Sequence, residues 1–214
     1  KAKNDGLSEG TLHMWAKNDN PKEYSNIMKK TVWTQIKACA TNPNFNPYDI
    51  AEIVHRLYKG IYVCVNYKTN AWFKFTQERW NEVEGPVCLK RKISKEIFGY
   101  FYHTSPSELL DDPNNPDHKK WALIQKNATQ LKQTSMKDNI IKECREWFYD
   151  DEKTFLNELN EKYNLIAFNN GVYDLDNEEL PFRAGRPDDY VSMCTNIDYH
   201  EYSWDDEIVK EILD

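Results

Sequence analysis

Glycine is scarce in this sequence, and the glycines that are present do not form a phosphate-binding loop. The 214 residues contain seven glycines, at positions 6, 10, 60, 85, 99, 171 and 185. None belongs to a GxxxxGK sequence followed by Ser or Thr, and the patterns GxGxxG, GxSxG and HExxH are absent as well. We therefore expect no nucleotide hydrolysis by this chain alone, and no cofactor of its own.

Long apolar runs, zinc-type cysteine spacing and an excess of positive charge are also missing. No run approaches the roughly 20 apolar residues of a membrane-spanning helix, so we expect an intracellular protein with no membrane partner. The five cysteines lie far apart with no CxxC pair, which predicts reduced, structural thiols. The formal net charge is −7, so any binding of nucleic acid must depend on a local patch.

Core-forming residues are plentiful. Aromatic residues make up 14% of the chain and hydrophobic residues 40%, which is unlike a disordered protein. Strand-forming residues predict an antiparallel meander over 61–83, and a polar, proline-rich connection follows at 105–117. Helical spacing and capping signals predict helices over 21–40, 47–60, 89–102, 118–132, 136–149 and 153–163. We expect an α+β fold that is mostly helical, with small antiparallel β-hairpins.

Several details of these helices are specific predictions. Asn20, followed by proline and by glutamate three residues on, predicts an N-cap with a capping box. Ser135, with an acid three residues later, predicts a second helix start of this kind. Helical spacing assigns Ile27 and Ile36 to the core-facing side of the first helix. The same spacing assigns Tyr163 to the inner side of the helix at 153–163.

The sequence IAFNNGVYDLD, residues 166–176, allows two interpretations. Asp174 and Asp176 have the DxD form with which enzymes of metal-dependent nucleotidyl transfer hold divalent ions near a phosphate. On a strand through 172–176, both carboxylates would share one face. Asn169-Asn170-Gly171 between two apolar runs is instead a hairpin signal, since Asn and Gly tolerate a positive φ. We favour the turn and keep the metal pair as the alternative.

Basic residues are candidates for contact with nucleic acid. The densest run is KRKISK, residues 90–95, and aromatic residues precede it at 72, 73, 75 and 80. Such a combination could pair phosphate contacts with base stacking, although aromatic strands more often form core. Two further lysines, seven residues apart, share the outer face of the helix at 118–132, where a solvated face is the simpler explanation. The candidates are Lys90, Arg91, Lys92, Lys95, Lys119 and Lys126.

The order of segments resembles a known family. From about residue 47 to the end, the chain is similar to the poxvirus-type linker domain that precedes the superfamily-three helicase domain in primase-helicases of large DNA viruses, phages and plasmids. The resemblance rests on WFKF at 72–75, the paired helices at 118–149, LIAFNNGVYDL at 165–175, RPDDYVS at 186–192, and Tyr199. Residues 10–24 more weakly resemble the tail of the primase carboxyl-terminal region. We therefore predict a primase-derived tail and linker helix at 1–45 and a linker or collar domain at 46–214.

The resemblance implies a larger protein around this chain. Lys1 in place of a methionine, and an uncapped amphipathic segment at 204–214, lead us to expect a piece of a longer polypeptide. That parent would carry a primase domain and a hexameric helicase that uses ATP and Mg²⁺, with the two domains and single- or double-stranded DNA as partners. Frequent Asn, Lys and Tyr fit an AT-rich genome such as that of a giant virus, with replication in the host cytoplasm.

The leading hypothesis is a non-catalytic linker segment that also contacts single-stranded DNA. One alternative is a metal-dependent nucleotidyl-transfer or nuclease domain that uses Asp174 and Asp176. Another is a pure scaffold for protein interactions, which the net charge of −7 favours.

Overall fold

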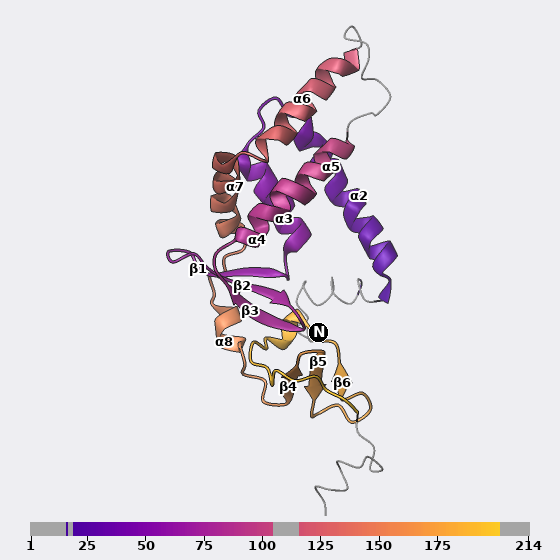
Figure 1. Cartoon of the computed structure of the whole chain (residues 1–214), viewed down its shortest axis with the longest axis vertical. Helices are drawn as coiled ribbons and strands as arrows, with labels where there is room; N and C mark the ends of the chain where they lie inside the picture. The colour runs from indigo at the N-terminus through magenta and orange to yellow at the C-terminus, as the bar shows by residue number, and fades with distance from the viewer. Residues whose placement is uncertain (1–15, 17–18, 105–115, 202–214) are drawn as a thin grey trace, which may run out of the picture.

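Three tiers of secondary structure follow one another along the long axis of the molecule (Figure 1). The computed structural model describes residues 16, 19–104 and 116–201. A body of helices occupies the upper part of the view, a three-stranded sheet lies below it, and a second small sheet lies at the lower end. The predicted connection at 105–117 falls mostly outside the described residues, and the segment at 204–214 lies entirely outside them.

The helical body contains two helices near its start, a segmented rod and a pair of helices that are consecutive in sequence. The first two are α2 (Pro21–Ala40) and α3 (Pro47–Tyr58). The rod consists of α4 (Val87–Lys92), a π-helical segment η1 (Ile93–Ile97) and α5 (Phe98–His103), and the pair is α6 (Pro116–Gln130) and α7 (Thr134–Trp147). In space, α7 packs against α3, and α6 packs against α5. A short helix, α8 (Thr154–Glu158), leads into the lower tier.

Asparagine side chains cap the starts of α2 and α3, at Asn20 and Asn46, and other details of the helices differ from expectation. The Asn20 side chain accepts a hydrogen bond from the backbone N–H of Glu23 at 3.1 Å, which confirms the predicted cap. The Ser135 cap was wrong, because α7 starts from Gln133 without a side-chain cap. Ile36 is buried, but Ile27 is 57% exposed, since α2 makes its core contacts through its second half. Tyr163 is 86% exposed, because α8 ends at Glu158.

The upper sheet is the predicted antiparallel meander. Its strands are β1 (Tyr62–Asn66), β2 (Ala71–Thr76) and β3 (Arg79–Val83), in the order β1-β2-β3. The chain that leaves α7 runs beside β1: Cys64 N–H donates to Phe148 O at 2.8 Å, and its carbonyl accepts from Asp150 N–H at 3.1 Å. These bonds fasten the sheet to the base of the helical body.

The lower sheet contains the predicted hairpin, although its turn is built differently. Its strands are β4 (Leu165–Phe168), β5 (Gly171–Asp174) and β6 (Phe182–Arg183). None of the residues 169–171 has a positive φ. A Cβ at Gly171 would lie 2.6 Å from the Arg183 carbonyl oxygen, so glycine is needed here for the close approach of β6. The Asn170 side chain instead bonds to the backbone N–H and carbonyl of Tyr199, at 2.8 and 2.9 Å.

The main core joins the helices to the upper sheet. Its fully buried side chains include Trp72 of β2, Ile50 of α3 and Phe101 of α5. Val32 and Ile36 of α2 belong to the same cluster, so both sides of the predicted boundary at 45/46 contribute to one core. The boundary itself stays a prediction. A second, smaller cluster, made of Ala167, Val172 and Val191, lies under the lower sheet. Together these elements confirm the predicted α+β class.

Candidate nucleic-acid interface

The predicted basic run lies on the rod where it passes the upper sheet. Lys90 forms an ion pair with α7. Its Nζ lies 2.5 Å from a carboxylate oxygen of Asp138, near the start of that helix. Arg91 and Lys95 are exposed. Lys92 lies 2.7 Å from Glu96 Oε1 and 4.6 Å from the centre of the ring of Tyr58. The four predicted residues therefore have three different environments.

Glu96 is held as a carboxylate between two donors. Lys92 donates to one oxygen, and the Tyr58 hydroxyl donates to the other at 2.7 Å. Burial raises the pKa of Glu96, but these hydrogen bonds and the charge of Lys92 outweigh burial and lower it overall. Burial and the bond to Glu96 raise the pKa of Tyr58 far above its ordinary value. At neutral pH the cluster thus contains one anion, one cation and one neutral donor.

A cavity of about 230 Å³ opens beside this cluster, between the rod and the upper sheet. Tyr62 of β1 and Lys74 of β2 are cross-strand partners, and both line it. The remaining lining comes from the rod: Cys88, Arg91, Lys92, Lys95 and Glu96. Lys74 was missed by sequence reasoning because it lies far from the basic run. The pairing of β1 with β2 brings it there. We call this cavity the basic pocket.

The two other predicted lysines lie elsewhere. Lys119 and Lys126 are exposed on α6, and neither lines the basic pocket. Helix α6 packs against α5, while α4 lies next to the upper sheet (Figure 1). The six predicted contact residues therefore do not form one surface.

Two of the four aromatic residues before the basic run, Trp72 and Trp80, are buried, and the other two, Phe73 and Phe75, are half-buried. Trp72 is completely buried, and Trp80 is 4% exposed. The indole N–H of Trp80 donates to Pro187 O at 2.7 Å, and its ring packs edge-on against Phe155 with centroids 4.9 Å apart. The ring of Phe75 packs edge-on against that of Trp80, with centroids 5.6 Å apart. These contacts favour the core interpretation, because an indole that is already packed on all sides cannot stack on a base.

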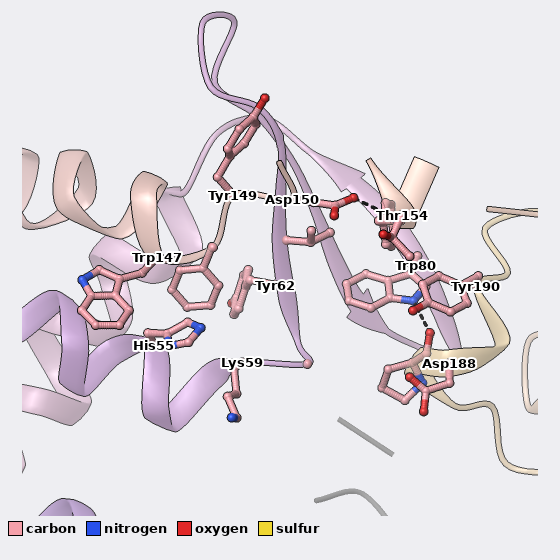
Figure 2. Close-up of a pocket in the computed structure, with 15 residues that line it drawn as sticks. His55, Lys59, Tyr62, Trp80, Trp147, Tyr149, Asp150, Thr154, Asp188 and Tyr190 are labelled. Atoms are coloured by element: carbon pink, nitrogen blue, oxygen red, sulfur yellow. Dashed lines mark hydrogen bonds between the residues drawn. The ribbon is translucent and has the colours of Figure 1, made fainter. Parts of the chain in front are cut away.

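A larger, mainly aromatic cleft of about 430 Å³ lies between the helical body and the lower tier (Figure 2). His55 contacts the rings of Trp147 and Phe148 there, with centroids 5.4 and 5.0 Å apart. Tyr190 and Asp188 border the opposite side. The cleft combines rings from all three tiers, and sequence reasoning did not predict it, because its residues come from four separate stretches of the chain, 55–63, 80, 147–155 and 187–190.

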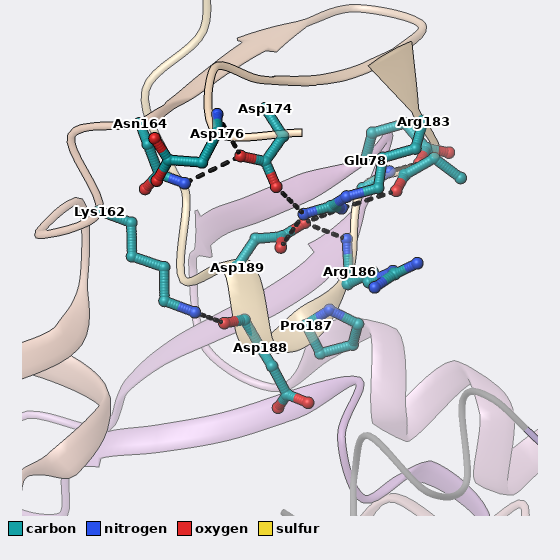
Figure 3. A network of polar contacts seen from close by, with 12 residues as sticks. Glu78, Lys162, Asn164, Asp174, Asp176, Arg183, Arg186, Pro187, Asp188 and Asp189 are labelled. Carbon is teal, nitrogen blue, oxygen red and sulfur yellow. Dashed lines mark hydrogen bonds and ion pairs between the residues drawn. The ribbon is translucent and has the colours of Figure 1, made fainter. Parts of the chain in front are cut away.

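The segment RPDDYVS forms the joint between the two sheets (Figure 3). Asp189, which is buried, accepts two hydrogen bonds from the Arg183 guanidinium, both at 2.8 Å, and one from Arg186 N–H at 2.7 Å. The hydrogen bonds to Asp189 raise the pKa of Arg183, and they outweigh burial, which lowers it. Glu78, at the turn before β3, accepts a hydrogen bond from Gly185 N–H at 2.5 Å. The joint thus ties the β2–β3 turn to β6.

The acid pair belongs to the edge of this joint. Asp174 accepts hydrogen bonds from Asn164 Nδ2 at 2.9 Å and from Asp176 N–H at 3.2 Å, and its second oxygen lies 3.8 Å from Arg183. Strand β5 ends at Asp174, and Asp176 is exposed in the following turn. The two carboxylates therefore do not share a strand face. A cation, Arg183, already faces Asp174, which favours the turn interpretation over the metal pair.

Nowhere in residues 19–104 and 116–201 do three or more His, Cys, Asp or Glu side chains gather closely enough to hold a metal ion. Among the described helices, none has both the length and the apolar character that a membrane span requires.

Curated proteins of large DNA viruses align with this chain over most of its length. It is 35% identical over 209 residues to "Putative helicase L207/L206" of Acanthamoeba polyphaga mimivirus, an alignment that covers 94% of this chain and 21% of that protein. It is 27% identical over 229 residues to "Putative helicase 022R" of Frog virus 3 (isolate Goorha), covering 90% and 22%. For "Putative helicase 121R" of Invertebrate iridescent virus 3, the identity is 26% over 241 residues, covering 96% and 25%. The chain spans about a fifth to a quarter of these relatives.

The fold and these alignments define a class: an α+β domain found within much larger viral proteins that are named as helicases. Within that class, the chain belongs to the family described as D5 N terminal like, whose model matches residues 51–214. This match confirms the family resemblance drawn from the sequence. Residues 186–192 and 165–175, which carried much of the resemblance, are the joint and the hairpin of the lower tier.

Proposed function

We propose that this chain is the linker and collar segment of a viral DNA-replication protein, where it joins a primase domain to a hexameric, ATP-dependent superfamily-three helicase. The family match over 51–214 carries the proposal. The relatives that contain this segment are named as helicases and are four to five times as long as the aligned part. Primase and helicase activities, and the ATP and Mg²⁺ that they use, belong in this proposal to the remainder of the parent protein.

The way the tiers are joined supports a linking role. Trp80 donates from its backbone N–H to Val191 O at 2.8 Å and from its indole to Pro187 O at 2.7 Å. The Asn160 side chain accepts from Ser192 N–H at 2.8 Å and donates to its hydroxyl at 2.8 Å. These hydrogen bonds of the backbone, of the buried Trp80 indole and of the Asn160 side chain hold residues 187–192 against β3 and the residues after α8. Such a fixed connection between the tiers is what a linking segment needs.

The motifs of the sequence agree with this assignment of ATP hydrolysis to the remainder of the parent protein. The 214 residues contain no GxxxxGK sequence followed by Ser or Thr, the loop with which many helicases hold the phosphates of ATP. In the proposal, this loop lies in the helicase domain of the parent. A scaffold that contacts only proteins is the second candidate, because the net charge of −7 disfavours a general attraction to DNA.

The proposal is tested by comparing the isolated chain with the full-length gene product. ATP hydrolysis, primer synthesis and native mass are measured for both. We expect the full-length protein to form hexamers, to hydrolyse ATP and to make primers, and the isolated chain to do neither reaction. Steady ATP hydrolysis or primer synthesis by the isolated chain would show that it is an enzyme in its own right. A full-length protein without ATPase activity would contradict the proposal as well.

A further inference from the structure

The basic pocket has an unusual balance of charge for this protein. Four cationic side chains line it, and Glu96 is its single carboxylate. Both oxygens of Glu96 are already occupied, one by Lys92 and one by the Tyr58 hydroxyl. Within residues 19–104 and 116–201, Lys74, Arg91 and Lys95 have no carboxylate at ion-pair distance. A local excess of positive charge is thus concentrated on a chain whose net charge is −7.

The floor of the pocket offers a hydrogen-bond donor that lacks an acceptor. Tyr62 is 4% exposed, and its hydroxyl has no partner among the described residues. Burial, followed by the charges of Cys88 and Glu96, raises the pKa of Tyr62 to about 12, so the hydroxyl keeps its proton at neutral pH. Leaving a buried donor unpaired costs about 1–3 kcal/mol. An acceptor that comes from outside the chain would satisfy this hydroxyl.

The rod changes its geometry at this pocket. The π-helical segment η1 begins directly after Lys92 and includes Lys95 and Glu96. Single π-helical turns are rare, and they occur frequently at functional sites. Here the wider turn carries two of the lining side chains, while α4 before it carries Arg91 and Lys92. The irregular segment therefore coincides with the cationic cluster.

The size of the pocket limits what it can hold. Pockets that enclose a whole small molecule measure about 300–1,000 Å³, whereas this one measures about 230 Å³. It is large enough for a phosphate group and too small to enclose a complete nucleoside triphosphate. Arg91 and Lys95 are exposed at its mouth, so a polymer could lie across the rod with one phosphate inserted.

We propose that the basic pocket, formed by Lys74, Arg91, Lys92 and Lys95, binds a backbone phosphate of single-stranded DNA. Phosphate oxygens accept hydrogen bonds from ammonium and guanidinium groups, and they match the excess of donors in this pocket. The choice of DNA as the source of the phosphate rests on the function proposed above, while recognition of the phosphate rests on the pocket alone. Lys90, Lys119 and Lys126 take no part, because the first pairs with Asp138 and the others lie on α6.

The experiment measures the affinity of the complete 214-residue chain for a fluorescent oligo-dT strand by anisotropy, over a series of salt concentrations. Two double variants are compared with the wild type: Arg91→Ala with Lys95→Ala, and Lys119→Ala with Lys126→Ala as the control. Both remove two exposed positive charges, so any general effect of net charge is equal. Each lost phosphate contact flattens the log–log salt slope by about 0.7 on single strands. Circular dichroism confirms that both variants are folded.

Because Arg91 and Lys95 contact the same phosphate in this proposal, we expect the pocket variant to flatten the slope by about 0.7 and the control to leave it unchanged. Equal slopes for the two variants would overturn the proposal, since binding would then follow net charge alone. A second arm adds ATP or inorganic phosphate as a competitor. Displacement of the strand by either at micromolar concentration would assign the pocket to a free phosphate compound and overturn the choice of DNA. Neither outcome changes the ATPase comparison above, so the two proposals fail separately.

Discussion

Replacing Asp189 with alanine should loosen the joint between the two sheets. Its carboxylate and the Arg183 guanidinium are almost fully enclosed, with side chains 7% and 13% exposed, and two hydrogen bonds of 2.8 Å join them. The same carboxylate accepts from Arg186 N–H. Removing it leaves a buried cation and a backbone donor without their partner.

The size of the effect can be worked out from these contacts. Breaking one side of a buried ion pair costs about 3–5 kcal/mol, because the remaining charge stays out of water. Asp174 lies 3.8 Å from Arg183 and still neutralises part of its charge in the variant. We therefore expect the free energy of unfolding to fall by about 3 kcal/mol, at the lower end of that range.

Urea unfolding followed by tryptophan fluorescence measures this change. Trp80 is a suitable reporter, because its indole bonds to Pro187 within the joint. Asp176→Ala is the matched control: Asp176 is an exposed acid on the turn next to the joint, and its loss should change stability by less than about 0.5 kcal/mol. A loss of under about 1 kcal/mol for Asp189→Ala, or equal losses for both variants, would refute the assignment of the joint to this ion pair.

Two further predictions concern glycines and thiols. Gly171→Ala should lower stability by roughly 1–3 kcal/mol, because the new Cβ meets the backbone of β6. Gly99→Ala should raise stability by about 0.5–1 kcal/mol, because a Cβ at this helical position would have nothing within 4 Å. Thermal unfolding distinguishes the two, and a neutral Gly171→Ala would contradict the close approach. In a native thiol titration at pH 8, only Cys88 and Cys194 should react quickly, because Cys39, Cys64 and Cys144 are buried and burial raises the pKa of each of the three. Quick reaction of a third thiol would contradict the burial of these cysteines.

Local chemistry explains which elements could be predicted from the sequence. Asn20 and Asn46 each cap a helix whose first residue is a proline, and both caps form as those residue types dictate. The meander follows from strand formers separated by polar turns, because the side chains and turns involved are neighbours in the chain. Such features depend on a few consecutive residues, so sequence alone is sufficient for them.

Features that depend on contacts between distant segments were not predictable in the same way. Ile27 has the spacing of a core residue, but it lies outside the core clusters of the described residues and is 57% exposed. The turn at Asn169 and Asn170 was expected to use a positive φ. It instead uses the Asn170 side chain to hold Tyr199 and the missing side chain of Gly171 to admit β6. In the turn, the residue types were interpreted correctly, but the neighbours that they contact lie elsewhere in the chain.

The basic pocket separates what the sequence determines from what packing determines. The sequence by itself determined that a dense cationic run would lie on a helix, and it determined the family to which the chain belongs. Only the tertiary structure decided that Lys90 is paired with Asp138 and that Lys74 takes its place beside Arg91. The physical reason is that helical and strand periodicity fixes the face on which a side chain lies, whereas packing between elements fixes which charges meet.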